Sequence, residues 1–298
     1  MESNFLTEVF LPISLGIIML GMGLSLTPAD FKRVALYPKA ATIGILNQIV
    51  VLPVIGFLLL LIFPMSTPEL AVGIMVLAAC PGGPTSNLIS HISRGDTALS
   101  ISLTAISSII VVFTIPPIVN LSLRYFMQQG EYVPLPVLNT MLSVIIITLV
   151  PVAIGMVIRA RAPRFAALMN KPVKIMSGIL LILVILAAVL NDKEILASSF
   201  RQAGPVALAL NLTMMLIGFF SARLFRLQVT QRITISIESG IQNGTLGITI
   251  CATLLHNPTM TISPAIYSLI MFMTAGVVIA WMNLGYKGDF TKEARRNL

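Results

Sequence analysis

Long apolar segments, separated by short connections, occupy most of the chain. Nine of them have about the 20 residues that a helix needs to cross a bilayer; they are residues 9–27, 39–63, 69–93, 96–126, 134–160, 173–190, 203–226, 230–256 and 262–285. Because lipid offers the backbone no hydrogen-bonding partner, a spanning segment of this length has to be helical. The sequence therefore predicts an all-α polytopic membrane protein with nine transmembrane helices, forming one transporter-sized unit over residues 1–298.

The composition excludes a soluble domain. The chain has 298 residues, of which 56% are hydrophobic and 10% charged, and its mean hydropathy is +0.96. Such values lie outside the range of soluble globular proteins. The net charge of +8 does not indicate a nucleic-acid partner, because the basic residues are confined to alternate connections between the apolar segments. The sequence does not indicate an obligate protein partner either.

Lysine and arginine are divided unequally between the two ends of the predicted helices. Sixteen of the 19 lie in the connections and tail on one side, and only Arg124, Lys193 and Arg201 lie on the other. The basic side is cytoplasmic by the positive-inside rule, so we expect the N-terminus outside and the C-terminus in the cytoplasm. The membrane would be the cell membrane, which is the inner membrane in a bacterium. The most basic connection, around residues 160–173, is predicted to be a cytoplasmic loop.

Two of the apolar segments are interrupted at corresponding places. Residues 80–87 (CPGGPTSN) interrupt the third segment, and residues 238–245 (ESGIQNGT) interrupt the eighth. Pro and Gly release backbone groups that need protein, water or an ion at membrane depth. Because the third and eighth segments run in opposite directions, the pattern predicts an inverted repeat, with halves at 9–126 and 173–285 and a connecting helix at 134–160. Paired broken helices are typical of secondary transporters, although either break alone also fits an ordinary kink.

Glu238 is the one acidic residue of eleven that lies deep inside an apolar segment. A carboxylate at membrane depth is costly unless a partner neutralises it, so it marks a candidate functional site. Oxygen donors near the two breaks could complete a shell for a hard cation; they are Gln48, Ser86, Asn87, Ser100, Thr104 and Gln242. Alternatively, the hydroxyls bond to carbonyls of their own helix and Gln48 makes an interhelical amide contact.

The sequence does not predict an enzyme or a transition-metal centre. Cys80 and Cys251 both lie in apolar segments and are interpreted as core thiols. His91 and His256 lie near the ends of segments on opposite sides of the membrane, so they cannot meet at one site. The chain therefore lacks the clustered His and thiolate ligands of such a metal site.

With these residues in place, the sequence resembles the bile acid:sodium symporter family over nearly its whole length. The resemblance is strongest at residues 80–83 (CPGG) with Ser86 and Asn87, at residues 94–96 (RGD) with 98–100 (ALS), and at Glu238 with Gly240, Gln242 and Asn243. Residues 21–26, Asp30, Phe31, Pro38, Lys39 and Gln48 also match. The number of segments is similar to that of the nine-span members.

The resemblance implies a core domain in which the two broken helices cross, a panel domain beside it, and two sodium ions near the crossing. The core would comprise spans 39–126 and 203–285, and the panel spans 9–27, 134–160 and 173–190. The first sodium site would use Ser86, Asn87, Ser100, Thr104 and Glu238. The second would use Gln48, Glu238 and Gln242 with the backbone carbonyls of Ser239 and Ile241.

The same resemblance places the substrate in the crevice between core and panel, near Pro84, Thr85 and Asn243. Of the apolar residues of the ninth span, Met271 and Phe272 are the ones expected to meet it. Pro84 departs from a simple anion site, because proline has no N–H to offer at the start of a half-helix. The resemblance implies that the substrate is an organic anion, either bile-acid-like or a smaller carboxylate.

These observations predict sodium-driven symport of an organic anion by alternating access. The alternative hypothesis is proton coupling, with Glu238 as the titrating group. The shell of neutral oxygens around Glu238 favours sodium over a proton. The two hypotheses differ in what happens to uptake when sodium is replaced at fixed pH.

Overall fold

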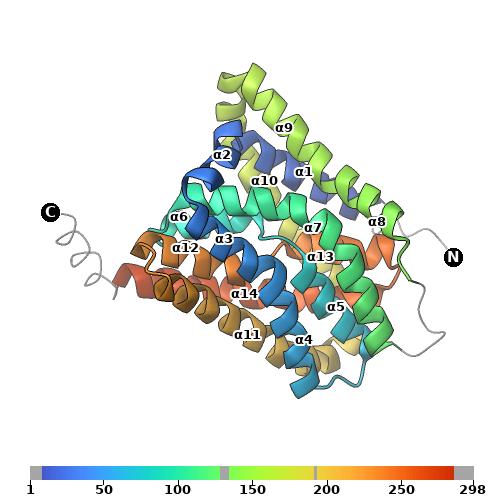
Figure 1. The fold of residues 1–298 in the computed structure, drawn as a ribbon. Coiled ribbons are helices and arrows are strands. Elements are labelled where there is room, and N and C mark those ends of the chain that lie inside the picture. The colour runs from blue at the N-terminus through green and yellow to red at the C-terminus, as the bar shows by residue number, and fades with distance from the viewer. Residues whose placement is uncertain (1–8, 128–133, 191–192, 285–298) are drawn as a thin grey trace.

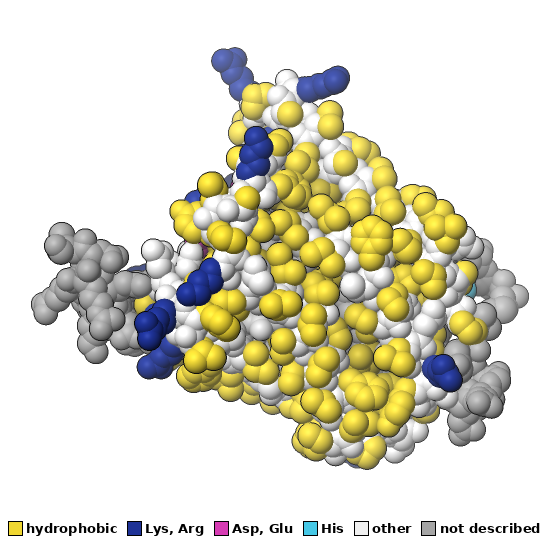
Figure 2. All heavy atoms as spheres, viewed as in Figure 1, with side chains coloured by type: hydrophobic (Ala, Val, Ile, Leu, Met, Phe, Trp, Pro, Cys, Tyr) yellow, Lys and Arg dark blue, Asp and Glu magenta, His cyan; other side chains and the backbone are white. Residues whose placement is uncertain are grey.

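The fold described below is that of a computed structural model, which describes residues 9–127, 134–190 and 193–284 (Figure 1). Apart from connecting turns and one isolated antiparallel bridge, this part of the chain is helical. The surface in Figure 2 is mostly apolar over the middle of the molecule. The exposed large apolar side chains of the described residues include Val54, Leu58, Phe113 and Ile146. Large exposed apolar side chains in such numbers indicate contact with lipid rather than water, which confirms the prediction of an all-α membrane protein.

Within the residues that the structure describes, six helices are long and apolar enough to cross a bilayer. They are Pro38–Ile62, which comprises α3 (Pro38–Leu46), η2 (Asn47–Val51) and α4 (Leu52–Ile62); α7 (Thr97–Phe126); Val137–Arg161, which comprises α8 (Val137–Val144), η3 (Ile145–Leu149) and α9 (Val150–Arg161); α10 (Pro163–Leu190); α11 (Lys193–Leu224); and α14 (Pro258–Leu284). A seventh candidate is the pair α1 (Leu11–Ser25) and α2 (Pro28–Leu36), which is bent by 68°.

The third and eighth predicted spans are each formed from shorter helices. The third consists of α5 (Pro68–Ala79) and α6 (Pro84–Ile92). The eighth consists of α12 (Val229–Gly240) and α13 (Gly244–Thr249), which continues as η4 (Ile250–Leu254). Both interruptions therefore lie at the Pro and Gly residues from which they were predicted.

Wide π-helical turns were not predicted. Two of the three, η2 and η3, end just before a proline, Pro53 and Pro151, each the second residue of the following helix. Proline lacks an N–H and clashes with the carbonyl four residues earlier, and a π turn relieves the clash without breaking the span. The turn η2 contains Asn47 and Gln48, and the Gln48 side chain donates to the Cys80 carbonyl at the first break.

The basic connection near residues 160–173 is not a loop. Helix α9 ends at Arg161, and α10 begins at Pro163, with Pro172 inside the helix. Proline in the first turn of a helix costs nothing because its missing N–H would be unpaired there, so Pro163 starts α10 at once. The prediction of a loop was wrong, because the end of an apolar segment marks where a span leaves the lipid but does not require the helix to end there.

Two groups of helices pack closely. Helix α1 packs against α9 and α10, and α11 packs against α12 and α14, with α5 also against α14 (Figure 1). Glycines allow the closest approaches: a Cβ on Gly23 of α1 would collide with the Val152 carbonyl of α9, and one on Gly73 of α5 with the Met260 carbonyl of α14. Close backbone approach through small residues is the usual way in which membrane helices associate. The two helix breaks follow α5 and α12, which belong to these packed helices.

Candidate functional site

Both helix breaks arise directly from their residues. Helix α5 ends at Ala79 before Pro81, which has no N–H to continue the helix, and α6 begins with Pro84. Helix α12 ends at Gly240, and α13 begins at Gly244 after Asn243, whose side chain accepts from Leu246 N at 3.0 Å. This Asn cap starts the second half-helix.

The two breaks are joined to each other through their backbones. Gly83 N donates to Ile241 O at 3.2 Å, and Asn243 N donates to Pro81 O at 2.9 Å. These bonds flank the antiparallel bridge between Gly82 and Gln242. Backbone groups released at each break are thus satisfied by the other, as membrane depth requires. A Cβ on Gly83 would lie 2.8 Å from Gln242 O, so only glycine fits this contact.

The Glu238 carboxylate lies beside this junction, where its side chain is 4% exposed. Its Oε1 accepts hydrogen bonds from Ser86 Oγ at 2.5 Å and from Ser100 Oγ. Its Oε2 accepts from Thr104 Oγ1 at 2.9 Å. Over the described part of the chain, no Lys, Arg or His forms an ion pair with it. Three neutral donors stabilise the carboxylate but leave its charge uncompensated.

The hydroxyls around Glu238 face more acceptors than they have protons. Ser86 Oγ also lies 2.8 Å from Gly83 O, Ser100 Oγ lies 2.9 Å from Asn87 Oδ1, and Thr104 Oγ1 lies 3.1 Å from Ser100 O. A hydroxyl has one proton and two lone pairs, so each of these groups satisfies only one acceptor at a time. The result is a cluster of oxygen lone pairs around a negative charge. Such a donor set, without nitrogen or sulfur, suits a hard monovalent cation.

A second polar group surrounds Gln48 and Gln242. Gln48 Nε2 donates to Cys80 O at 3.0 Å and to Gln242 Oε1 at 2.5 Å, and Gln242 Nε2 donates to Ser239 O at 2.9 Å. Gln48 Oε1 is buried and has no hydrogen-bond partner among the described residues. The group therefore offers a free amide oxygen beside both breaks.

The structure brings the two predicted ligand sets together to different degrees. Ser86, Asn87, Ser100, Thr104 and Glu238 form one hydrogen-bonded cluster. In the second set, Gln48, Gln242 and the Ser239 carbonyl are bonded to one another, whereas the Ile241 carbonyl is bonded to Gly83 N. The described hydrogen bonds do not link Glu238 to Gln48 or Gln242. The carboxylate thus lies with the first set in this conformation.

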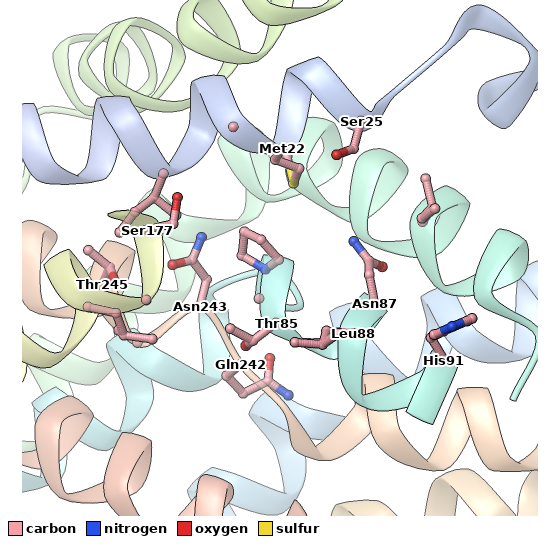
Figure 3. A pocket seen from close by; sticks show the side chains of 18 of the residues that line it. Met22, Ser25, Thr85, Asn87, Leu88, His91, Ser177, Gln242, Asn243 and Thr245 are labelled. Atoms are coloured by element: carbon pink, nitrogen blue, oxygen red, sulfur yellow. The ribbon is translucent and has the colours of Figure 1, made fainter. Parts of the chain in front are cut away.

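A cavity of about 430 Å³ lies next to the junction (Figure 3). Its walls come from α1, α6, α7, α10, α13 and α14 together with both breaks. Pro84, Thr85, Asn243 and Met271 line it, as do Asn87 and Gln242, one from each of the two polar groups. Phe272 is outside the lining and packs among apolar side chains. None of the lining side chains is Lys, Arg, Asp or Glu.

The sequence of the chain matches the model of a known protein family. Residues 12–199 match the model of the Sodium Bile acid symporter family. The chain belongs to this family. It is therefore a multi-pass membrane protein of a transporter family, as the apolar helices and the resemblance predicted.

Relatives within the sodium bile acid symporter family cover most of the chain. An uncharacterized sodium-dependent transporter of Bacillus subtilis, YocS, is 30% identical over 87% of this chain and 78% of its own length. A probable sodium/metabolite cotransporter of rice chloroplasts, BASS2, is 29% identical over 95% of this chain and 67% of its own length. The rat hepatic sodium/bile acid cotransporter is 29% identical over 89% of this chain and 73% of its own length.

In this member of the family, one wall of the cavity was missed by sequence reasoning. Met22 and Ser25 of α1 and Ser177 and Gly178 of α10 line the cavity (Figure 3). Both helices are apolar around most of their circumference, so no periodic pattern distinguishes the face that meets a cavity from the face that meets lipid. The small residues Ser177 and Gly178, side by side in an apolar span, were the available signal.

Proposed function

We propose that this chain is a sodium-coupled symporter that carries an organic anion by alternating access. The observation that carries the proposal is the Glu238 carboxylate, buried with three hydroxyl donors and no cationic partner among the described residues. A charge in this position costs several kcal/mol unless it is balanced. Sodium bound by Glu238, Ser86, Asn87, Ser100 and Thr104 balances it with an all-oxygen shell.

A second sodium ion is proposed at Gln48 and Gln242. The free Oε1 of Gln48 and the carbonyls of Ser239 and Ile241 supply oxygens. Because Glu238 is not bonded to this group in the present conformation, occupancy of the second site requires a shift of its carboxylate or of Gln242. Both ions are cargo that crosses with the anion.

Coupling follows from the place of the cavity. Asn87 belongs to the Glu238 cluster and Gln242 to the second polar group, and both line the cavity. An anion bound there meets the first turns of α6 and of the Gly244–Leu254 helix, where the helix dipole is positive. Sodium adds positive charge behind the same residues. Anion and cation binding therefore support each other.

The transport cycle requires two states open to opposite sides. The six long helices, α1 and the two broken spans together give nine crossings, with the helices before and after α8–α9 as the inverted halves. We assign spans two, three, four, seven, eight and nine to a core and spans one, five and six to a panel. The close packing of α1 against α9 and α10 supports this division, and the cavity between α10 and the breaks lies where the two parts would separate.

The membrane potential favours this exchange. Two sodium ions with one monovalent anion carry one net positive charge inward, which the potential drives by about 2.3 kcal/mol per 100 mV. Uptake should thus rise when the interior is made negative, even at equal sodium on both sides.

The decisive experiment is uptake by purified protein in liposomes. Radiolabelled cholate and pyruvate represent the bile-acid and small-metabolite classes named for the relatives, and each is measured with external sodium, potassium or choline at fixed pH. We expect uptake of one of the two only in sodium. Uptake that is unchanged when sodium is replaced rejects sodium coupling, and uptake driven by a proton gradient in choline would establish the proton-coupled alternative.

A binding measurement on purified protein complements it. A ligand at 100 times its Kd stabilises the folded state by about 2.7 kcal/mol. Sodium alone should raise the unfolding temperature, and an organic anion should raise it further only when sodium is present. The wild type should show no such shift with potassium.

A further inference from the structure

Four glycines line the cavity, and three of them are explained by packing. A Cβ on Gly21 would lie 2.5 Å from Val173 Cγ1, and one on Gly83 would lie 2.8 Å from Gln242 O. A Cβ on Gly244 would collide with Ser268 Oγ. Any side chain at these positions would push helices or breaks apart. Gly178 is different, because a Cβ there would meet no atom within 4 Å.

Neither backbone geometry nor packing requires glycine at position 178. The residue lies inside α10 and has no positive φ. Glycine is a weaker helix former than alanine. The open space at Gly178 adjoins the cavity, since the residue is part of its lining. The absence of a side chain thus enlarges the cavity at a cost to the helix.

The direction of a side chain at this position follows from its neighbours. Ser177, Gly178 and Leu181 all line the cavity. Leu181 is three residues after Gly178 and four after Ser177, and residues with these spacings lie on one face of a helix. Ser177 lies across from Asn243 and Thr245 in Figure 3. A side chain at 178 would therefore extend from α10 toward the second break.

We propose that Gly178 determines which anions this protein accepts, by setting the width of the cavity between α10 and the second break. The proposal rests on the proposed function, because it assigns the cavity to the transported anion. Larger side chains at 178 should exclude wide substrates and admit narrow ones. Sodium binding, which uses other residues, should not change.

Gly276 provides a matched control. It too lies within a long helix, α14, and a Cβ there would also meet no atom within 4 Å. Unlike Gly178, it is exposed and outside the cavity lining. Equivalent substitutions at 178 and 276 therefore add the same atoms to a membrane helix, once toward the cavity and once away from it.

The first test is independent of any substrate. Gly178→Cys and Gly276→Cys are treated with a charged, membrane-impermeant methanethiosulfonate reagent in liposomes opened to both sides. Cys80 and Cys251 are fully buried and should contribute little background, which the wild type measures. We expect Cys at 178 to react and Cys at 276, facing lipid, to resist. Resistance at 178 in a folded variant, or equal reaction at 276, would overturn the proposal.

The second test measures size selection. Sodium-dependent thermal stabilisation by cholate and by cyclohexanecarboxylate is compared for Gly178→Ala, →Val and →Leu and for Gly276→Leu. We expect the affinity for the widest anion that stabilises the wild type to fall by about tenfold or more across the 178 series. Narrower anions and sodium alone should be unaffected, and Gly276→Leu should behave like the wild type. Parallel loss of both anions, or none, contradicts a role in width.

The outcomes separate this proposal from the proposed function. If the wild type shows no sodium-dependent stabilisation or uptake of any anion, the symport proposal fails. If it does, and the 178 variants match the wild type for both probes, only the role of Gly178 fails. The labelling result determines whether residue 178 faces the cavity in either case.

Discussion

Glu238 combines a full charge with incomplete neutralisation. Its three hydroxyl partners, Ser86, Ser100 and Thr104, donate hydrogen bonds but carry no charge. In a low-dielectric interior a paired charge is tolerated, whereas an isolated one is not. The protein therefore tolerates this residue best with a cation bound. In the proposed function, the carboxylate would therefore respond to sodium occupancy as well as bind the ion.

We predict that Glu238→Gln abolishes sodium-driven uptake without unfolding the protein. The amide keeps the shape of the side chain and one acceptor oxygen, but it removes the charge that sodium balances. Thermal stabilisation by sodium, about 2.7 kcal/mol at 100 times the Kd in the wild type, should disappear. Glu69→Gln, which changes a carboxylate in the first turn of α5, is the control and should retain it. Normal sodium-driven uptake by Glu238→Gln would refute the coupling scheme.

The pair Gln48 and Gln242 allows a second test at this scale. Replacing either with Ala should raise the sodium concentration for half-maximal uptake by about tenfold, because each supplies an amide oxygen to the proposed second site. Since the two side chains are bonded at 2.5 Å, their effects should not add. Asn47→Ala is the control, because Asn47 bonds instead to Ser221 Oγ at 2.9 Å. An unshifted sodium curve for Gln242→Ala removes that residue from the site.

At the scale of helices, the two breaks position the residues of the candidate site, and glycine allows the close contacts between them. Gly82 lies in the first break, and a Cβ there would lie 2.7 Å from Glu238 Oε2. The second break is held from outside as well, because Asn211 Nδ2 and Tyr267 Oη both donate to Gly240 O, at 2.8 and 2.9 Å. The last carbonyl of α12 is thereby fixed to α11 and α14. The position of Glu238 is set from both sides of the junction.

Gly82→Ala should accordingly weaken sodium binding although it adds only one methyl group. The added carbon displaces the carboxylate, and overpacking of this kind costs about 1–3 kcal/mol, or about tenfold or more in affinity. Gly56→Ala in α4 is the control, because its Cβ would lie at an ordinary 3.4 Å from Ala78 Cβ. Sodium titrations followed by thermal unfolding compare the two variants. Equal sodium affinity in both would show that the Glu238 carboxylate has room to move.

Helix types and breaks were predictable because lipid leaves the backbone few choices. Pro81 cannot continue a helix and Gly82 and Gly83 weaken one, so their place in an apolar segment located the first break. Glu238 stood out by its charge alone. The rotation of each helix was not predictable, since both sides of a membrane helix are apolar. Met271 lines the cavity and Phe272, the next residue of α14, does not. Consecutive residues of a helix point in different directions, and the sequence did not show which of the two faces the cavity. The π turn at Gln48 was not predictable, because a proline such as Pro53 can also be accommodated by a simple kink.

The whole molecule has two chemically different ends. Asp96 N donates to Thr230 O, which places the connection holding Arg94 beside the start of α12 near Arg232. Arg159 of α9 donates to Leu24 O at the end of α1. At the other end, Gln202 Oε1 accepts from Ser66 N and Thr67 N beside Arg201. Figure 2 shows most Lys and Arg side chains along the upper left margin, with a broad apolar surface beyond them.

This asymmetry predicts the orientation of the protein in the membrane. By the positive-inside rule, the end with Lys32, Arg94 and Arg159 should face the cytoplasm, and the end with Arg124 and Arg201 should face outward. Lys32→Cys and Arg124→Cys replace exposed residues, one at each end, and are labelled with an impermeant maleimide in intact cells and again after lysis. We expect Cys at 124 to react in intact cells and Cys at 32 only after lysis. The reverse pattern would show that the protein has the opposite orientation. External sodium would then enter from the end with Lys32 and not from the end with Arg124.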